Sequence, residues 1–166
     1  MNIIILAAGR GTRINEVTHS KHKSLIDIDG ESAAAYFHSC NRGKSSITID
    51  LSKTSDQLRL KKLIQSSDIL IENFKVGGLK KYGFDYESVK SINPALIYCS
   101  ITGFGQTGPY SHRAGYDYII QGMSGFMSIT GESGEMPQRA GVAVTDLFTG
   151  LYATTAILSA IHMRNE

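Results

Sequence analysis

The sequence predicts an α/β fold: an open, mostly parallel sheet of Rossmann-like type with helices flanking it. Two observations lead to this prediction. Short apolar runs of strand length alternate along the chain with stretches that show the apolar spacing of a helix, as in a series of βαβ units. Polar or glycine-containing turns follow the runs, and ligands of such sheets bind at the carboxyl ends of the strands. With 166 residues, 42% of them hydrophobic, the chain is large enough for about one domain with a real core.

The distribution of charge argues against a nucleic-acid-binding protein. The 17 Lys and Arg residues and the 15 Asp and Glu residues are spread over the whole length and leave a net charge of +2. No basic face is therefore predicted. None of the five histidines stands in a pair with metal-ligand spacing, so we expect no metal.

Cysteine usage and the first apolar run indicate a cytoplasmic protein. Cys40 and Cys99 lie far apart and lack CxxC spacing, which argues against a structural zinc site or a disulfide framework. The run from Ile3 to Ala8 is too short to span a bilayer, and no basic segment precedes it. Neither a signal peptide nor a membrane helix is predicted there.

The first predicted element is a buried parallel strand, Asn2 to Leu6, that runs into a turn with Gly9, Gly11 and Arg13. Such a turn presents backbone N–H groups to a phosphate. It lacks the lysine pattern of a Walker loop and the third glycine of a dinucleotide fingerprint. Spacing alone leaves two interpretations open: a phosphate loop, or a strand and turn that only pack on the sheet.

The motif LAAGRGTR, followed by Lys23 in SKHKSLIDIDG, resembles the start of the sugar-phosphate nucleotidyltransferases. The resemblance implies that Gly9, Gly11, Arg13 and Lys23 contact nucleotide phosphates. It ends before the aspartates that bind magnesium in that family. We therefore predict a first segment, residues 1–32, made of a nucleotidyltransferase-like strand and glycine-rich loop.

Strands and helices alternate from about Ala33 onward. The predicted elements are a strand from Ile47 to Leu51, a helix with its cap among Thr54, Ser55 and Asp56, a strand from Asp68 to Glu72, a helix from Asp85 to Ile92, and a strand from Leu96 to Ile101. The last two strands end in Glu72-Asn73-Phe74 and Thr102-Gly103-Phe104-Gly105. We expect ligand binding at these two ends.

The segment from Gly103 to Gly125 contains six glycines. This density is typical of a binding loop that needs positive φ angles and close approach of the backbone. The loop leads into a helix predicted from Tyr116 to Met127. Taken alone, Tyr116 and Asp117 also fit ordinary helix-start residues.

The stretch RAGVAVTDLFTG, from Arg139 to Gly150, places one carboxylate, Asp146, among small and apolar residues at the predicted start of a helix. Free N–H groups and the positive end of the helix dipole would keep Asp146 ionised, as a nucleophile that attacks an activated acyl group requires. From position alone, a plain N-cap is the simpler interpretation of this residue.

Five motifs in order resemble the pattern of the family III CoA-transferases: NRGKSSITIDL, DILIENF, NPALIYCSITGFGQTGPY, GYDYIIQGMSG and GVAVTDLFTG. This group includes the carnitine, formyl-CoA and bile-acid CoA-transferases and the α-methylacyl-CoA racemases. The match covers roughly residues 35–166. A second segment, residues 33–166, is therefore predicted to be part of a CoA-transferase large domain, incomplete relative to the full family fold.

The resemblance implies that Asp146 is the catalytic aspartate, which forms a mixed anhydride with the acyl group and then a thioester with CoA. It also implies two groups of binding residues: Lys44, Asn73 and Phe74 lining the CoA site, and Tyr116 and Asp117 beside the thioester. The racemases typically have His at the position of Tyr116. A tyrosine, with an ordinary pKa of about 10, is a poor base near neutral pH, so a transferase is favoured over a racemase.

The implied partners are an acyl-CoA and a carboxylic acid acceptor, with CoA as a substrate and no metal, nucleic acid or membrane. The full-length family implies a homodimer. Its members are longer than this chain, so we expect a truncated or fused fragment of a CoA-transferase. Two alternatives stay open: a nucleotide-binding fragment derived from a nucleotidyltransferase, and a non-enzymatic domain that associates with other chains.

Overall fold

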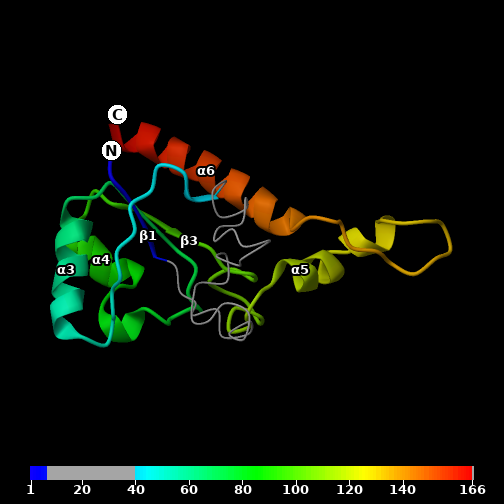
Figure 1. Cartoon of the computed structure of the whole chain (residues 1–166), viewed down its shortest axis with the longest axis horizontal. Coiled ribbons are helices and arrows are strands. Elements are labelled where there is room, and N and C mark those ends of the chain that lie inside the picture. Colours follow the sequence, from blue (N-terminus) through cyan, green and yellow to red (C-terminus); the bar gives the residue numbers. More distant parts are fainter. Residues whose placement is uncertain (7–39, 166) are drawn as a thin grey trace, which may run out of the picture. The chain divides into compact units, whose positions relative to one another are not determined.

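The computed structural model describes residues 1–6 and 40–165. The chain divides into two compact units, one formed by residues 1–6 and 51–166 and the other by residues 7–50. Figure 1 shows the described elements, all of which belong to the first unit except the segment 40–50. The predicted phosphate-binding residues Gly9, Gly11, Arg13 and Lys23 lie outside the described residues.

The first unit is built on a parallel sheet, as predicted. Strands β1 (Ile3–Leu6), β2 (Ile69–Glu72) and β3 (Ile97–Ser100) lie in the order β1-β2-β3, and both pairings are parallel. The register aligns Ile4 with Leu70 and Leu70 with Tyr98, so these three side chains share one face. The strand predicted at the start of residues 1–32 thus pairs with a strand of the later segment.

Helices α3 (Thr54–Gln65) and α4 (Tyr86–Ile92) pack on this face of the sheet (Figure 1). Between them and the strands lies a core of fully or nearly fully buried side chains: Leu60, Ile64, Leu70, Leu79, Phe84 and Val89. Burial of each of these side chains contributes roughly 1.5–3 kcal/mol. This core fixes the position of β2 and β3, and therefore of their carboxyl ends.

The structure corrects two local predictions. Residues 47–50 form neither a helix nor a strand, because alternation of Ile with polar residues produces a strand only where a neighbouring strand supplies hydrogen bonds. The N-cap position of α3 is Lys53, whose side chain makes no capping hydrogen bond, so the predicted cap among Thr54, Ser55 and Asp56 is wrong. Asp56 lies in the first turn, where its charge is favourable to the helix dipole.

The glycine-rich segment leads into a shorter helix than predicted. Helix α5 spans Asp117–Met123, and a 3-10 turn, η3, spans Phe126–Ile129. Gly125 separates the two with a φ of 82°, a left-handed conformation that breaks the helix. A second 3-10 turn, η2, covers Lys80–Tyr82 before α4.

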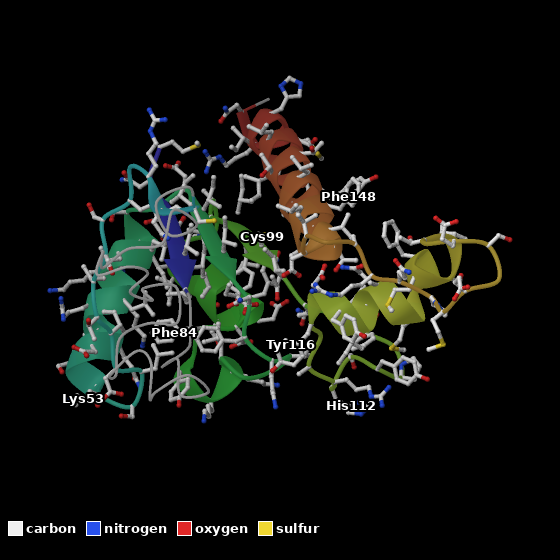
Figure 2. All side chains as sticks on the ribbon, turned by 45° about the vertical axis from the view of Figure 1, so that its right-hand side comes forward. Lys53, Phe84, Cys99, His112, Tyr116 and Phe148 are labelled. Carbon is white, nitrogen blue, oxygen red and sulfur yellow. The ribbon has the colours of Figure 1, made fainter. Side chains whose placement is uncertain are left out.

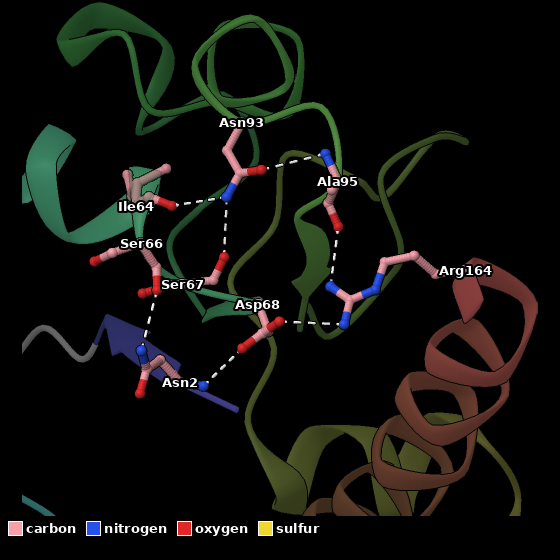
Figure 3. A network of polar contacts seen from close by, with 8 residues as sticks. All are labelled: Asn2, Ile64, Ser66, Ser67, Asp68, Asn93, Ala95 and Arg164. Carbon is pink, nitrogen blue, oxygen red and sulfur yellow. Dashed lines mark hydrogen bonds and ion pairs between the residues drawn. The ribbon is translucent and has the colours of Figure 1, made fainter.

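Helix α6 (Val144–Asn165) contacts β3 and is held at its C-terminal end by a polar network (Figure 3). Arg164 donates to the carbonyl oxygen of Ala95 and to the Asp68 carboxylate, each at 3.2 Å. Asp68 also accepts from the backbone N–H of Asn2 at 2.8 Å. The network therefore joins the end of α6 to the starts of β1, β2 and β3.

None of the residues of α6 is buried. Figure 2 shows its side chains, Phe148 among them, standing out from the ribbon. Among the described residues, α6 alone has the length and apolar composition of a helix that could cross a membrane. A helix buried in the core of a soluble protein meets the same two criteria.

Candidate active site

Asp146 lies in the first turn of α6, as its third residue. The sequence correctly places it at the start of a helix, but it is not the capping residue. Among the described residues, the Asp146 carboxylate accepts no hydrogen bond, and the residue is exposed. Its carboxylate is thus available to a ligand.

Asp117 supplies the cap that α6 needs. Its Oδ1 atom accepts from the backbone N–H of Thr145 at 2.8 Å and from the Thr145 hydroxyl at 2.6 Å. The backbone N–H of Asp146 also donates to this carboxylate. The first free N–H groups of α6 are therefore satisfied by a side chain from α5.

Gln121 lies one turn after Asp117 on α5 and is completely buried. Its Nε2 donates to Asp117 Oδ2 at 2.6 Å and to the carbonyl oxygen of Val142 at 3.4 Å. Its Oε1 accepts from the backbone N–H of Ala140 at 2.8 Å. The buried amide thus connects α5 to the segment that leads into α6.

The two aspartates have opposite electrostatics. Burial acts to raise the pKa of Asp117, but hydrogen bonds from Thr145, Gln121 and the backbone of Asp146 outweigh it and lower the pKa below the usual value. Partial desolvation of the Asp146 carboxylate, and then the negative charge of Asp117, raise the pKa of Asp146. The expectation that free N–H groups of the helix stabilise the charged form of Asp146 is therefore wrong, because Asp117 accepts from those groups. The raised pKa makes the Asp146 carboxylate more basic, and a more basic carboxylate is a better nucleophile.

Tyr116 occupies the N-cap position of α5 and is half exposed (Figure 2). Its extended backbone places its carbonyl oxygen 3.1 Å from the N–H of Ile120, which closes the first turn. Tyr116 and Asp117 are adjacent in the chain, so the structure brings the predicted residues Tyr116, Asp117 and Asp146 to one junction between α5 and α6.

The carboxyl ends of β2 and β3 form a second part of the candidate site. Glu72 is 6% exposed and accepts from the backbone N–H of Phe74 at 2.7 Å and from the Ser100 hydroxyl. Gln106 in turn donates to the Ser100 hydroxyl at 2.6 Å. The buried carboxylate therefore fixes the turn that carries the predicted CoA-site residues Asn73 and Phe74.

A cavity of about 300 Å³ opens at this edge of the sheet. It is lined by residues from three parts of the chain: Glu72 and Lys75 to Leu79 after β2, Asp85 and Tyr86 at the start of α4, and Tyr98, Ser100 and Gln106 along and after β3. It lies at the carboxyl ends of β2 and β3, where ligand binding is predicted, and that binding stays a prediction. Asn73 and Phe74 adjoin this lining without being part of it.

Two backbone segments cross closely after β3. A Cβ atom added to Gly103 would lie 2.3 Å from the Cα of Gly115, and the reverse holds for Gly115. Only glycine at both positions allows this approach. The crossing brings the start of the glycine-rich loop next to the residue that precedes Tyr116, as the prediction of close backbone approach requires.

Lys44 belongs to the other compact unit. Its ammonium donates to the Cys40 carbonyl oxygen, and its backbone N–H donates to the Asn41 carbonyl oxygen at 3.2 Å, which closes the predicted polar turn. Its role in CoA binding stays a prediction. Within residues 1–6 and 40–165, no group of three or more His, Cys, Asp or Glu side chains is arranged to hold a metal ion.

The family model described as CoA-transferase family III matches residues 10–166, so the chain belongs to that family. The match begins within residues 1–32, and the predicted resemblance of that segment to nucleotidyltransferases gains no support from it.

Among curated relatives, a succinate-glutarate CoA-transferase from Agrobacterium fabrum is 60% identical over 134 residues, 80% of this chain and 34% of the relative. A succinyl-CoA:glutarate CoA-transferase from Mus musculus is 47% identical over 131 residues, 79% of this chain and 30% of the relative. The crystal structure of a CAIB/BAIF family protein from Brucella suis has a TM-score of 0.86 and 47% identity, and the match covers 99% of this chain and 49% of that one. The chain therefore spans about a third of these curated relatives and about half of the solved structure.

Proposed function

We propose that this chain carries the nucleophile and part of the CoA site of an acyl-CoA:carboxylate CoA-transferase. The observation that carries the proposal is the position of Asp146: an exposed carboxylate on the first turn of α6, with a second carboxylate, Asp117, beside it. This is the arrangement expected of a nucleophilic aspartate whose basicity is raised by its surroundings.

The proposed reaction has four steps, in which the acyl group and CoA are transferred by way of the Asp146 carboxylate. The Asp146 carboxylate attacks the thioester carbonyl of the donor, and the C–S bond breaks to give a mixed anhydride and CoA thiolate. The thiolate then attacks the aspartyl carbonyl, which releases the donor acid and leaves an aspartyl-CoA thioester. The acceptor carboxylate attacks that thioester, which forms a second mixed anhydride and releases CoA thiolate. The thiolate then attacks the acceptor acyl carbonyl, which gives the CoA ester of the acceptor and frees the Asp146 carboxylate.

The proposed substrates are short dicarboxylic acids and their CoA esters. Both curated relatives named above carry glutarate in their names, and each also carries succinate or succinyl-CoA. The cavity at the ends of β2 and β3, with Lys75 in its lining, is the proposed place for part of the CoA moiety. Lys44, Asn73, Phe74 and Tyr116 are proposed to contact CoA or the thioester.

A chimera tests the function, because the chain spans only part of its relatives. The 134 matched residues of the Agrobacterium fabrum relative are replaced by those of this chain, and exchange of isotopic label between succinate and succinyl-CoA is measured. We expect exchange in the chimera and at least a ~10³-fold loss in Asp146→Asn, since an amide cannot form the anhydride. Glu87→Gln, which removes an exposed carboxylate from the first turn of α4, is the matched control and should exchange normally. Equal exchange in Asp146→Asn and the unsubstituted chimera would refute the assignment.

A further inference from the structure

We propose that Asp117 and Gln121 together are positioning residues that hold the Asp146 turn of α6 in place, as a clamp between α5 and the segment 140–146. The inference deepens the proposed function and rests on it for the role of Asp146. The sequence assigns Gln121 no role and places Asp117 only beside the thioester.

The geometry of the clamp begins with the spacing of the two residues. Asp117 and Gln121 stand four residues apart on α5, so their side chains lie on the same face of the helix. The Nε2 atom of Gln121 donates to Oδ2 of Asp117 at 2.6 Å. Because this bond occupies Oδ2, the other oxygen, Oδ1, is the one that accepts hydrogen bonds from α6.

The clamp anchors the segment before Asp146 by hydrogen bonds at both of its ends. Gln121 Oε1 holds the backbone N–H of Ala140, and Asp117 Oδ1 holds the backbone N–H and hydroxyl of Thr145. Four residues, 141–144, therefore lie between the two anchored N–H groups. Loss of either side chain removes the acceptor of one of these N–H groups, and this loss destabilises the turn.

Gln121 is placed so that it cannot be exchanged for an apolar residue without loss. Its side chain is completely buried, and its amide has partners on both sides: Ala140 on the oxygen, and Asp117 and Val142 on the nitrogen. A buried amide with partners on both sides specifies one arrangement of the groups around it. A leucine of similar size would leave the Ala140 N–H without its acceptor.

The clamp acts on Asp146 through the backbone and through charge. The Asp146 carboxylate accepts no hydrogen bond from the described residues, so its orientation follows from the helical turn to which it belongs. Among the charged groups of the described residues, Asp117 is the one whose charge raises the pKa of Asp146. The same carboxylate therefore holds the turn that carries Asp146 and adds to the rise in the pKa of Asp146 that partial burial causes.

Three variants of the 166-residue chain separate these effects without any measurement of activity. Asp117→Ala removes both the cap and the charge. Asp117→Asn keeps an oxygen for Thr145 but removes the charge and replaces the acceptor of Gln121 Nε2 with an amide nitrogen. Gln121→Leu keeps the charge and removes the anchor of Ala140. Thr154→Ala is the matched control, because its exposed hydroxyl bonds only within α6, to the Gly150 carbonyl oxygen at 2.8 Å.

The first readout is amide hydrogen exchange by NMR. In Asp117→Ala, the N–H groups of Thr145 and Asp146 should exchange about fivefold faster or more, as expected for loss of an N-cap. In Gln121→Leu the Ala140 N–H should show the corresponding increase. Thr154→Ala should leave all three rates unchanged. Native exchange rates of Thr145 and Asp146 in Asp117→Ala would overturn the proposed clamp.

The second readout is the pKa of the Asp146 carboxyl, followed by carbon-13 NMR. The pKa should fall in Asp117→Asn relative to the native chain and stay unchanged in Thr154→Ala. A cap with only a structural role would leave this pKa in place, and that result would overturn the proposal. Because neither readout requires turnover, an inactive Asp146 with both shifts present would refute the proposed function and leave the clamp intact.

Discussion

Two aspartates of the candidate site show how strongly the surroundings decide what a residue does. Asp117 accepts hydrogen bonds through both oxygens, which lowers its pKa, whereas Asp146 accepts none from the described residues and its pKa is raised. The sequence places both at helix starts, and that much of the site was predictable. It does not indicate that Asp117 caps the helix that begins 27 residues later, at Val144, because a cap from another helix leaves no local pattern.

One feature of the sequence points to Gln121 and Glu72. Each is a polar residue that follows directly on an apolar run, in YIIQ and ILIE. Such a residue is buried only if its polar atoms find partners, and both do. Which partners they find depends on segments far away in the chain, so their roles needed the structure.

A pH-dependent contribution to stability is expected from Asp68. The backbone N–H of Asn2 is the largest cause that lowers its pKa, and Arg164 lowers it further. A carboxylate with a lowered folded-state pKa stabilises the fold above its unfolded value of 3.8, and this contribution is lost as the pH falls through the folded pKa.

Substitution of Asp68 by Asn should therefore make the urea midpoint less dependent on pH in the acidic range below pH ~4. The measurement is a series of urea unfolding curves for the native chain and Asp68→Asn across that range. Asp56, which is partly buried and paired with Arg59 at 3.4 Å, provides the control substitution Asp56→Asn. Parallel pH profiles for the native chain and Asp68→Asn would contradict this explanation.

The helices and strands illustrate what local patterns predict. The strands from Ile69 and Ile97 and the helices from Thr54 and Tyr86 were predicted within a residue or two, because each has both an apolar pattern and a partner to pack against. Residues 47–51 have the pattern but form no strand. An alternating pattern indicates which side chains could face a core, and pairing with a neighbour decides whether a strand forms.

The crossing of Gly103 and Gly115 predicts that a side chain at either position destabilises the fold. Gly103→Ala would place its Cβ 2.3 Å from the Gly115 Cα, where only backbone movement relieves the clash. We expect a loss of about 1–3 kcal/mol in the free energy of unfolding, the usual cost of overpacking.

Gly122→Ala is the control for this substitution. Its Cβ would meet only Met127 Sδ at 3.6 Å, an ordinary contact, and alanine is better than glycine inside α5 by about 1 kcal/mol. Thermal unfolding of both variants decides the matter. A Gly103→Ala protein as stable as Gly122→Ala would show that the two backbone segments do not approach as described.

At the scale of the whole molecule, α6 is a long helix none of whose residues is buried by the described part of the chain. Its 22 residues include several exposed large apolar side chains, namely Leu147, Phe148, Leu151, Tyr152, Leu158 and Met163. On β1, Ile3 and Ile5 are about half exposed as well. Apolar surface on this scale is typical of a face that contacts other protein or lipid. Leu147 and Phe148 directly follow Asp146, so whatever covers that end of α6 lies next to the proposed nucleophile.

The family match covers residues 10–166 and so concerns nearly the whole chain. Motifs from NRGK to VTDLFTG predicted the family correctly, because they combine positions of the turn at Lys44, the ends of β2 and β3, and the start of α6. These motifs do not determine which acyl group is transferred. Side chains that select an acyl group occupy positions that differ between relatives with the same fold, so fold and family leave the substrate to experiment.

The central claim is that Asp146 is the nucleophile, and trapping its covalent intermediate tests this claim most directly. The chimera described above is incubated with succinyl-CoA, reduced with borohydride, digested, and analysed by mass spectrometry for the peptide that contains Asp146. We predict reduction of the Asp146 carboxyl to an alcohol, with a mass change confined to that residue, because borohydride reduces an aspartyl thioester and leaves a free carboxylate unchanged. The change should depend on succinyl-CoA and disappear in Asp146→Asn. An active chimera with an unmodified Asp146 peptide, or with the modification on another carboxylate, would contradict the account.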